Sequence, residues 1–311
     1  MYWKEKAFTM LRIENLTVHF KTNMGLVRAV DGVSLSVNEG ETFTVIGESG
    51  SGKSVLGLSI LRLLPKNALA RGKIIFNGKN LLELNEKEMR RIRGREITWV
   101  PQNVSFLNPV LNVGFQCAEP IIQHMKLEIK SAWERVKRVF NFLKIGDRLK
   151  DYPHQFSGGM RQRVLVAMGI TTNPKLIIAD EPTKGLDADK RENVIELFES
   201  IKGKTILLIT HDLHLAERIA DRIAVLYCGK ILEICNANEF FEEPLHPYSI
   251  GLINSLPSRG LKPIKGFQPS MINPPKGCRF RERCEFASSK CKEEPPLINL
   301  NGRFVRCWLY D

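Results

Sequence analysis

The sequence has no long apolar run, which argues against a membrane-spanning chain. No stretch approaches the roughly 18 to 20 consecutive apolar residues that a membrane helix needs. Residues 1–10 hold Lys4, Glu5 and Lys6 and have no apolar core, so we expect no secretory signal. We find no internal repeat and no low-complexity tract. We therefore expect a soluble protein that works in the cytosol.

Cysteine is scarce over most of the chain and crowded near its end. Three scattered cysteines are expected to be small core residues: Cys117, Cys228 and Cys235. Four others follow the spacing C-x5-C-x6-C-x15-C: Cys278, Cys284, Cys291 and Cys307. Because cytosolic chains rarely form disulfides, these four suggest a metal site. Four thiolates suit either a [4Fe–4S] cluster or tetrahedral zinc, although the close C-x2-C pairs of common zinc ribbons are missing.

The composition is that of an ordinary globular protein. Of 311 residues, 43% are hydrophobic and 26% are charged, so a large core is possible. The formal net charge is +12, with the densest basic cluster at Arg90, Arg91, Arg93 and Arg95. This excess indicates either a solvated surface or attraction to an anionic partner such as lipid, nucleic acid or nucleotide. Charge alone does not separate the two.

Strand and helix patterns alternate along most of the chain. Strands are predicted at 16–20, 33–37, 41–46, 72–77, 97–100, 176–179, 205–210 and 223–226. Helices are predicted at 53–64, 189–201 and 212–220, and a helical insertion at about 103–172 carries Val136, Val139, Phe140 and Leu143 on one face. The alternation predicts an α/β fold whose parallel sheet is covered on both faces. After about residue 256, prolines and glycines indicate an extended linker.

The strongest local signal is the segment 47–54, which reads Gly-Glu-Ser-Gly-Ser-Gly-Lys-Ser. It matches G-x-x-x-x-G-K-[ST] and lies between a predicted strand and a predicted helix. Glycines allow backbone N–H groups to surround phosphate oxygens, and the helix N-terminus adds its positive dipole end. Lys53 would contact the outer phosphates, and the Ser54 hydroxyl would bind Mg²⁺. We call this segment the phosphate loop.

Two carboxylates follow the apolar strand 176–179. Asp180 and Glu181 come at its C-terminal end, where open α/β sheets bind ligands. Asp180 would hold Mg²⁺, and Glu181 would polarise the water that attacks the γ-phosphorus. Taken alone, the pair is equally consistent with a helix cap.

A second candidate anion site begins a predicted helix. Ser157, Gly158 and Gly159 precede the helical run 164–170 and would leave backbone N–H groups open. The segment alone is also typical of an ordinary N-cap. A chain with one phosphate loop needs such a second site only if each subunit of a dimer covers the nucleotide of the other.

With these motifs in order, residues 11–236 resemble an ATP-binding-cassette (ABC) ATPase. The resemblance implies a P-loop NTPase fold with a parallel core sheet, an N-terminal antiparallel β subdomain, an inserted α-helical subdomain and a small C-terminal cysteine-rich tail. It divides the chain into a nucleotide-binding domain at 11–256 and a linker with a four-cysteine extension at 257–311.

The resemblance also implies residue roles. The catalytic residues are Glu181, His211, Gln102 and Lys53. The nucleotide-binding residues are Phe20, Gly47, Glu48, Ser49, Gly50, Ser51, Gly52, Lys53, Ser54, Val55, Gln102 and Asp180, and the Mg²⁺ ligands are Ser54, Gln102 and Asp180. Ser157, Gly158 and Gly159 are the signature motif, with Phe156 where leucine is usual, and Gly185-Leu186-Asp187 is the D-loop. On local grounds Phe20 suits a core strand equally well, His211 suits a helix cap, and Gln102 suits an ordinary loop.

The end of the chain resembles one branch of this family. His246-Pro-Tyr-Ser and the segment that begins at Gly277-Cys278-Arg279-Phe280 are similar to the tails of oligopeptide and dipeptide importer ATPases. That resemblance implies a [4Fe–4S] cluster on the four cysteines, with Zn²⁺ as the alternative. Nearby arginines are expected to offset the cluster's negative charge: Arg279, Arg281, Arg283, Arg303 and Arg306.

The function implied is ATP hydrolysis coupled to the import of di- or oligopeptides, with nickel as the alternative cargo. The implied partners are a second, non-identical ABC ATPase, two membrane permease subunits that dock on 103–172, and indirectly a substrate-binding protein. The chain would lie peripherally on the cytoplasmic face of the membrane, with ATP and Mg²⁺ as cofactors. An ABC ATPase acting on nucleic acid is the competing class, although the chain has one cassette and no coiled-coil insertion. A small-molecule kinase fits less well because of Ser157, Glu181 and His211.

Overall fold

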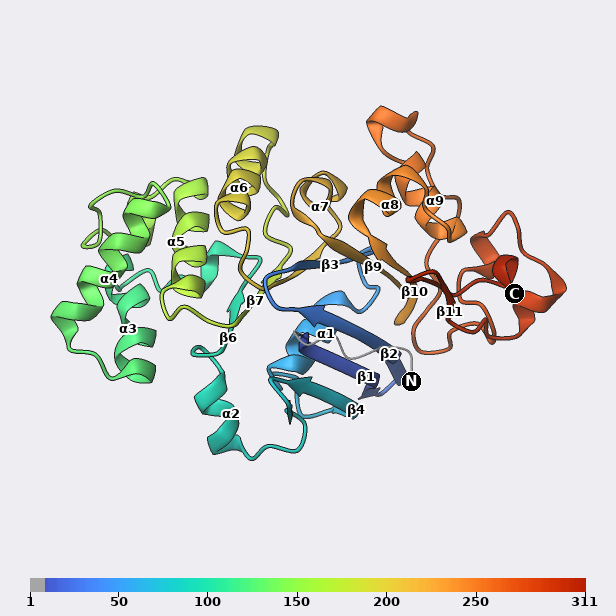
Figure 1. The fold of residues 1–311 in the computed structure, drawn as a ribbon, viewed down its shortest axis with the longest axis horizontal. Helices are drawn as coiled ribbons and strands as arrows, with labels where there is room; N and C mark the ends of the chain where they lie inside the picture. Colours follow the sequence, from blue (N-terminus) through green and yellow to red (C-terminus); the bar gives the residue numbers. More distant parts are fainter. Residues whose placement is uncertain (1–8) are drawn as a thin grey trace. The chain divides into compact units, whose positions relative to one another are not determined.

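The computed structural model describes residues 9–311, so the expectation about a secretory signal lies mostly outside the described residues. The chain divides into two compact units, each described by itself (Figure 1). Of the described residues, the first unit contains 9–37, Phe43–Leu82 and Ala220–Asp311; the second contains Asn38–Thr42 and Glu83–Ile219. In the part of the chain described, no helix is long and apolar enough to cross a membrane.

An antiparallel sheet opens the first unit. Its order is β2-β1-β4-β5, with bounds β1 Thr9–Thr22, β2 Gly25–Asn38, β4 Ala68–Phe76 and β5 Lys79–Asn80. On β1, Leu11, Ile13, Leu16 and Val18 are fully buried, which is the alternation expected of a strand with one face on a core. The predicted strands at 16–20, 33–37 and 72–77 are therefore confirmed, with longer bounds.

A second sheet in the first unit joins segments that are distant in the sequence. Its order is β11-β12-β10-β9-β3, with bounds β3 Thr42–Ile46, β9 Arg222–Tyr227, β10 Lys230–Asn236, β11 Ile298–Leu300 and β12 Arg303–Val305. β3 and β9 are parallel, and the remaining neighbours are antiparallel. Strands from the end of the chain thus extend the sheet that carries the phosphate loop.

The helices of the first unit are short. They are α1 Lys53–Ile60, α8 Ala237–Glu242 and α9 Pro247–Asn254, with 3-10 turns at Pro257–Arg259, Arg281–Arg283, Ser289–Lys292 and Trp308–Tyr310. The helix predicted over 53–64 was too long. It ends at Ile60 because Leu61 is its C-cap and Arg62 has a left-handed φ of 53°, so the chain turns before Pro65.

The second unit contains a parallel sheet, β6-β7-β8, and most of the helices. The strands are β6 Ile97–Val100, β7 Leu176–Asp180 and β8 Ile206–Thr210. The helices are α2 Glu86–Ile92, α3 Val113–Met125, α4 Ile129–Phe142, α5 Gly158–Ile170, α6 Ala188–Ser200 and α7 Leu213–Ile219, with 3-10 turns at Val104–Phe106 and Pro153–Gln155. These elements confirm the parallel sheet and an inserted helical region, and α3, α4 and α5 lie within the predicted bounds 103–172.

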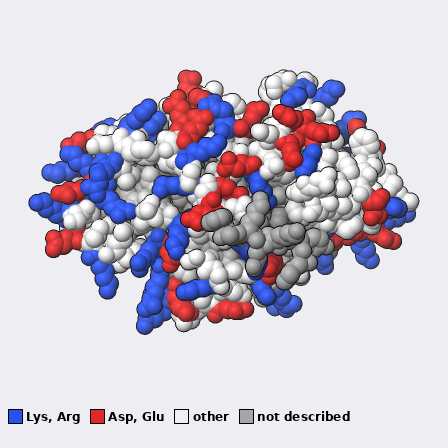
Figure 2. Space-filling model, viewed as in Figure 1, with Lys and Arg blue, Asp and Glu red and all other residues white. Residues whose placement is uncertain are grey.

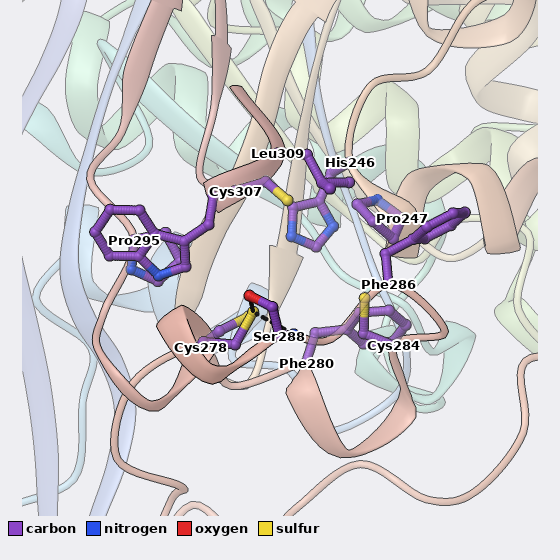
Figure 3. Close-up of a pocket in the computed structure, with 12 residues that line it drawn as sticks. His246, Pro247, Cys278, Phe280, Cys284, Phe286, Ser288, Pro295, Cys307 and Leu309 are labelled. Carbon is purple, nitrogen blue, oxygen red and sulfur yellow. Dashed lines mark hydrogen bonds between the residues drawn. The ribbon is translucent and has the colours of Figure 1, made fainter. Parts of the chain in front are cut away.

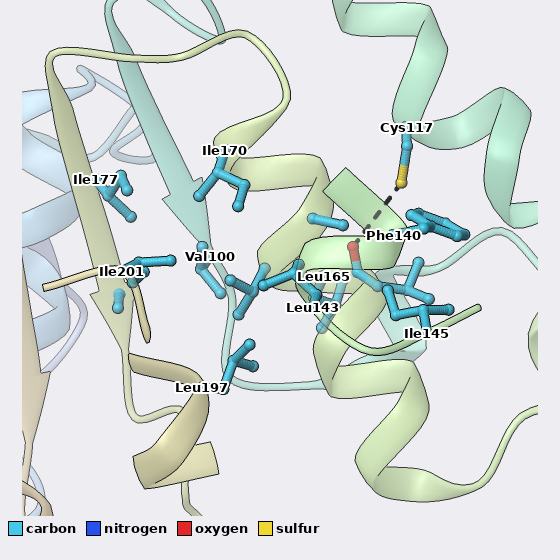
Figure 4. Close-up of a cluster of buried hydrophobic side chains, with 14 of the residues drawn as sticks. Val100, Cys117, Phe140, Leu143, Ile145, Leu165, Ile170, Ile177, Leu197 and Ile201 are labelled. Carbon is cyan, nitrogen blue, oxygen red and sulfur yellow. Dashed lines mark hydrogen bonds between the residues drawn. The ribbon is translucent and has the colours of Figure 1, made fainter. Parts of the chain in front are cut away.

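The core of the second unit joins its sheet to its helices. Figure 4 shows Val100 of β6 and Ile177 of β7 beside Leu165 and Ile170 of α5. The expected apolar face of α4 is also confirmed, because Phe140 and its helical neighbours pack into this cluster. This packing fixes the ends of β7 and α5, which carry the predicted carboxylates and the Ser-Gly-Gly segment.

Charged side chains of both signs are interspersed on the face that Figure 2 shows. The predicted basic cluster lies on and after α2, where Arg93 contacts Glu86 at 2.6 Å and Arg90 contacts the same carboxylate at 3.7 Å. These pairs favour a solvated surface as the interpretation of the cluster.

Candidate functional site

The phosphate loop joins β3 to α1, and its glycines are required by close backbone contacts. Every residue of β3 is buried, so the loop begins from a fixed strand. A Cβ atom on Gly52 would lie 2.0 Å from the Ala29 carbonyl oxygen, and one on Gly47 would lie 2.1 Å from that of Leu226. Gly52 also has a left-handed φ of 106°. No other residue type fits at these two positions without moving the backbone.

Lys53 lies inside the loop. Its side chain is buried, and its ammonium donates hydrogen bonds to the carbonyls of Gly47 at 2.8 Å and Glu48 at 3.0 Å. Gly52 is the N-cap of α1 and offers no side-chain acceptor to the first helical N–H groups. The Ser51 hydroxyl is buried without a hydrogen-bond partner in the part of the chain described. A buried cation, the N-terminus of a helix and the Ser51 hydroxyl together suit a bound phosphate.

In the second unit, Glu181 and His211 meet. Asp180 ends β7, and both acidic residues are buried. Glu181 has a left-handed φ of 49°, and its carboxylate lies 2.5 Å from Nδ1 of His211 and accepts the backbone N–H of the same histidine at 3.2 Å. Strained backbone of this kind is concentrated at functional sites. An ionised carboxylate this close to the ring requires a proton on Nδ1, which leaves Nε2 for another partner.

Neither the acidic pair nor His211 caps a helix. Asp212 caps α7 by accepting N–H groups of His214 at 3.1 Å and Leu215 at 3.2 Å. Asp187 is the N-cap of α6, and its hydrogen bond with Lys190 holds its pKa below the usual range. The capping alternatives for Asp180, Glu181 and His211 are therefore wrong.

The Ser-Gly-Gly segment forms the open tip of α5. Ser157 is the N-cap and accepts the Met160 N–H at 3.4 Å, and a Cβ on Gly159 would meet nothing within 4 Å. Phe156, which stands where leucine is usual, is buried, and the Arg148 guanidinium lies 4.4 Å from its ring centroid. The aromatic side chain thus has its own packing, and the helix tip remains accessible to an anion.

Two predicted residues lie at the margins of these clusters. Phe20 is only half-buried near the end of β1, unlike Leu16 and Val18, so it is not a core strand residue. Gln102 is exposed just after β6. Phe20 and the phosphate loop belong to the first unit, whereas Gln102, the carboxylates, His211 and the α5 tip belong to the second.

The four terminal cysteines line one cavity. It has a volume of about 70 Å³ and is otherwise lined mainly by apolar side chains and His246. Figure 3 shows Cys278, Cys284 and Cys307 around it. Burial raises the pKa of Cys278 to about 11, and the other three cysteines act in the same direction, as groups close together do. Burial lowers the pKa of His246 to about 3, so this imidazole is neutral.

The expected metal site is not supported by the structure as it stands. Among residues 9–311, no group of three or more His, Cys, Asp and Glu side chains is placed to hold a metal ion. The arginines expected to offset a cluster's charge are instead bonded elsewhere. Arg279 contacts Asp31 and the Cys228 carbonyl, Arg281 the Lys276 carbonyl, Arg283 Glu48, Arg303 the Glu243 carbonyl, and Arg306 Glu294. They brace the fold because their guanidinium groups reach backbone and carboxylate acceptors.

Sequence reasoning missed the residues that hold the phosphate loop from outside. Tyr248 and Arg283 both contact Glu48, and Gln268 contacts Gly50. In the sequence, Tyr248 stands out only as part of a segment that resembles a family tail. Arg283 stands out only as a positive charge near the cysteines. Their separation from the loop along the chain left no local signal of the contact.

Comparisons with known proteins agree with this geometry. The profile of the "ABC transporter" family matches residues 30–184, and that of "Oligopeptide/dipeptide transporter, C-terminal region" matches residues 232–291. The dipeptide transport ATP-binding protein DppD of Bacillus subtilis is 43% identical, over 97% of this chain and 95% of that protein. The oligopeptide transport ATP-binding protein OppD of Escherichia coli is 38% identical, over 98% and 94%. Among solved structures, a dimeric post-hydrolysis state of the ATP-binding cassette MJ0796 bound to ADP and Pi matches with a TM-score of 0.65 and 27% identity, over 73% of this chain and 99% of that one.

Proposed function

We propose that this chain binds and hydrolyses ATP to drive the import of small peptides. The chain belongs to the ABC transporter family and to its oligopeptide/dipeptide branch. The observation that carries the proposal is the phosphate loop, in which required glycines, Lys53 and the start of α1 form a phosphate site. The chain is the ATP-binding subunit of the importer.

The phosphate loop binds the triphosphate. Lys53 contacts the outer phosphates, which are stronger acceptors than the carbonyls of Gly47 and Glu48 and compete with them for its three donors. Ser54, Gln102 and Asp180 supply hydroxyl, amide and carboxylate oxygens, the hard donors that suit Mg²⁺. When bound, that ion neutralises charge on the phosphates. The half-buried Phe20 offers a ring on which adenine can stack.

The second unit supplies the groups for hydrolysis. Glu181 accepts a hydrogen bond from the attacking water and orients it toward the γ-phosphorus. His211 donates its Nδ1–H to Glu181, and in the doubly protonated imidazolium its Nε2–H donates to a γ-phosphate oxygen. Holding the carboxylate by the histidine fixes its direction, and positioning is the main task in phosphoryl transfer.

A second cassette completes the site. The open tip of α5, formed by Ser157, Gly158 and Gly159, binds the γ-phosphate of ATP that the other subunit holds. One phosphate loop and one such tip per chain support this reciprocal arrangement, as does the dimeric state of the similar cassette. We propose that the partner is a non-identical ATPase subunit.

The membrane partners are two permease subunits, which receive peptide from a substrate-binding protein. We propose that they dock on the helical insertion of the second unit, where large apolar side chains are exposed: Phe106, Val110, Ile129 and Phe142. Exposed apolar surface of this kind marks interaction sites. This places the chain on the cytoplasmic face of the membrane as a peripheral subunit.

Reconstituted vesicles test the cargo. The vesicles contain the full chain, its cassette partner, the permeases and the binding protein. They should take up radiolabelled di- or tripeptides when ATP is supplied on the side of the membrane that carries the cassettes. Uptake of Ni²⁺ without uptake of peptide would show that the cargo is nickel and not peptide. Salt-sensitive retention of RNA or DNA, with no permease co-purifying from membranes, would favour the nucleic-acid class instead.

We propose that the four-cysteine cavity holds a [4Fe–4S] cluster. The fit is chemical: four thiols line one cavity, yet no three of them converge as ligands of a single ion. Four thiolates are the ligand set that such a cluster takes. Cys278, Cys284, Cys291 and Cys307 would be the ligands, and the apolar lining would exclude water.

The cluster has a direct test. Anaerobically purified full chain should show broad absorbance at the blue end of the visible spectrum and about four iron atoms per chain. Cys291→Ser should lower both, whereas Cys117→Ser, in the core of the second unit, should change neither. Stoichiometric zinc without colour would contradict the cluster and leave the ATPase proposal untouched.

A further inference from the structure

Arg283 of the cysteine-bearing tail reaches into the phosphate loop. Its guanidinium donates a hydrogen bond to a carboxylate oxygen of Glu48 at 2.9 Å and to the Tyr227 hydroxyl at 3.3 Å. The arginine side chain is only 6% exposed, and that of Glu48 is 30% exposed. A charge-assisted bond shielded from solvent in this way is among the stronger contacts that a side chain makes.

Glu48 is held at three separate points. Its backbone N–H donates to the Tyr248 hydroxyl at 3.0 Å, its carbonyl accepts from Lys53 at 3.0 Å, and its carboxylate accepts from Arg283. The same carbonyl also accepts the Ser51 N–H at 3.2 Å. Glu48 is therefore held from outside the loop at its N–H and its carboxylate, by Tyr248 and Arg283, and from inside the loop at its carbonyl.

An aromatic cluster links these contacts to the cysteine cavity. Phe280 packs edge-on against Tyr227, with ring centroids 5.4 Å apart, and tilted against Tyr248 at 5.3 Å. Phe280 lines the cavity and lies between Cys278 and Cys284 in the sequence (Figure 3). The residues that hold Glu48 are thus packed on the wall of the four-cysteine cavity.

Nucleotide binding makes the outer contacts more important. Bound phosphates would compete with the Gly47 and Glu48 carbonyls for the three donors of Lys53, so the support that Lys53 gives to the loop is weakened on binding. Tyr248 bonds to the backbone N–H of Glu48, and Arg283 bonds to its carboxylate. Both bonds can persist when nucleotide is bound. Gln268, also in the tail, adds a bond to the Gly50 carbonyl at 3.2 Å. A loop that keeps its shape loses less entropy when it binds.

We propose that Arg283 is a positioning residue that fixes the phosphate loop through Glu48, and that the cysteine-bearing tail thereby sets nucleotide affinity. The inference rests on the proposed role of the phosphate loop in ATP binding. Arg283 touches no substrate atom in this account, since it acts on the loop alone. It should therefore change affinity and KM for ATP and leave kcat at saturating ATP nearly unaltered.

The test is a double-mutant cycle on the full chain, read out by titration with a fluorescent ATP analogue. We expect about tenfold weaker binding for Arg283→Gln, as for loss of one charged hydrogen bond. Glu48→Gln should also weaken binding, and the double variant should be no worse than Arg283→Gln alone. Arg283→Lys should recover part of the affinity. The matched control is Arg281→Gln in the same turn, whose bond is to the Lys276 carbonyl.

The cycle separates positioning from simple charge. If Arg283 acted only as a distant positive charge, Glu48→Gln would tighten ATP binding, and the two effects would add. That outcome, or an Arg283→Gln affinity within twofold of the control, would overturn the proposal. Circular dichroism and thermal unfolding identify any variant that fails to fold, and the partly exposed Glu48→Gln then carries the test by itself. Failure of the phosphate loop as such is seen separately, as unchanged binding by Lys53→Ala.

Discussion

The phosphate loop and the Glu181 site both follow a fully buried strand, yet they are held in different ways. Glu181 is held within its own unit by His211, which follows the neighbouring strand β8. The phosphate loop is held by Tyr248 and Arg283, which lie 200 and 235 residues further along the chain than Glu48. The comparison suggests that the hydrolytic residues form a local, self-contained cluster, whereas the nucleotide-binding residues depend on the end of the chain.

The largest expected effect belongs to the local cluster. Glu181→Gln should lower ATP turnover by about 100-fold or more, because the amide cannot accept the proton of the attacking water. ATP affinity should be retained, and a dimer should accumulate with ATP in light scattering. The control is Glu196→Gln on the exposed face of α6. ATP turnover equal to that of the wild type would show that Glu181 has no role in hydrolysis. It would also contradict the contrast between a local hydrolytic cluster and a phosphate loop held by the end of the chain.

The next effect tests the loop's own backbone. Gly52→Ala should lower the free energy of unfolding by at least about 3 kcal/mol and abolish ATP binding, because its Cβ would lie 2.0 Å from the Ala29 carbonyl. Gly159→Ala at the open tip of α5 is the control for stability, since nothing lies within 4 Å of its added Cβ. Chemical denaturation measures both. Equal stability of the two variants would contradict the close packing of the loop.

A smaller effect concerns the contact between the tail and β2. Asp31 contacts Arg279 and Lys230, and Asp31→Asn should cost about 2 to 3 kcal/mol because it leaves the buried Arg279 poorly paired. Asp147→Asn, in an exposed pair with Lys137, should cost less than about 1 kcal/mol. Similar losses for both variants would mean that the tail is not braced through Asp31.

The same carboxylate predicts a pH dependence. Burial pushes the pKa of Asp31 upward, but the charges of Lys230, Arg279 and His19 outweigh it and hold the pKa below its usual value. Because the pKa of Asp31 is lowered in the folded state, its ionised carboxylate stabilises the fold at pH values above the ordinary pKa of about 4. This stabilisation is lost as the pH falls below that value. The stability difference between wild type and Asp31→Asn should therefore be retained at neutral pH and shrink below about pH 4.

The smallest effect is expected at the unusual signature residue. Phe156→Leu should cost about 1 kcal/mol, from a smaller buried side chain and loss of the Arg148 contact. The tip of α5 should keep its shape because Ser157 still caps the helix. A thermal shift assay and ATP turnover measure this; a large loss of turnover with unchanged stability would show that the aromatic ring itself acts in the site.

The contrast between the two regions also explains what sequence could predict. The phosphate loop, the acidic pair and the Ser157 segment were found because each is a short motif at the end of a periodic element. Even α2 had a local signal that went unused, the capping box of Asn85 and Glu88. Local pattern also misled at α1, where an apolar run to Leu64 concealed the turn at Arg62.

The rest was out of reach because it depends on contacts between distant segments. The pairing of β12 with β10 has no motif, since three residues of strand carry little periodicity. The tail arginines were assigned to a cluster by their nearness to cysteines in the sequence, yet their side chains contact Asp31, Glu48 and Glu294. The direction in which a side chain points is set by tertiary packing. The spacing of residues along the sequence does not encode that direction.

The central claim is that the phosphate loop binds the nucleotide through Lys53, and titration of ATP into Lys53→Ala tests it most directly. Loss of the ammonium should weaken binding by about 100-fold, the loss of two charge-assisted hydrogen bonds, while the fold remains intact by circular dichroism. Binding as tight as that of the unmodified chain would contradict the account.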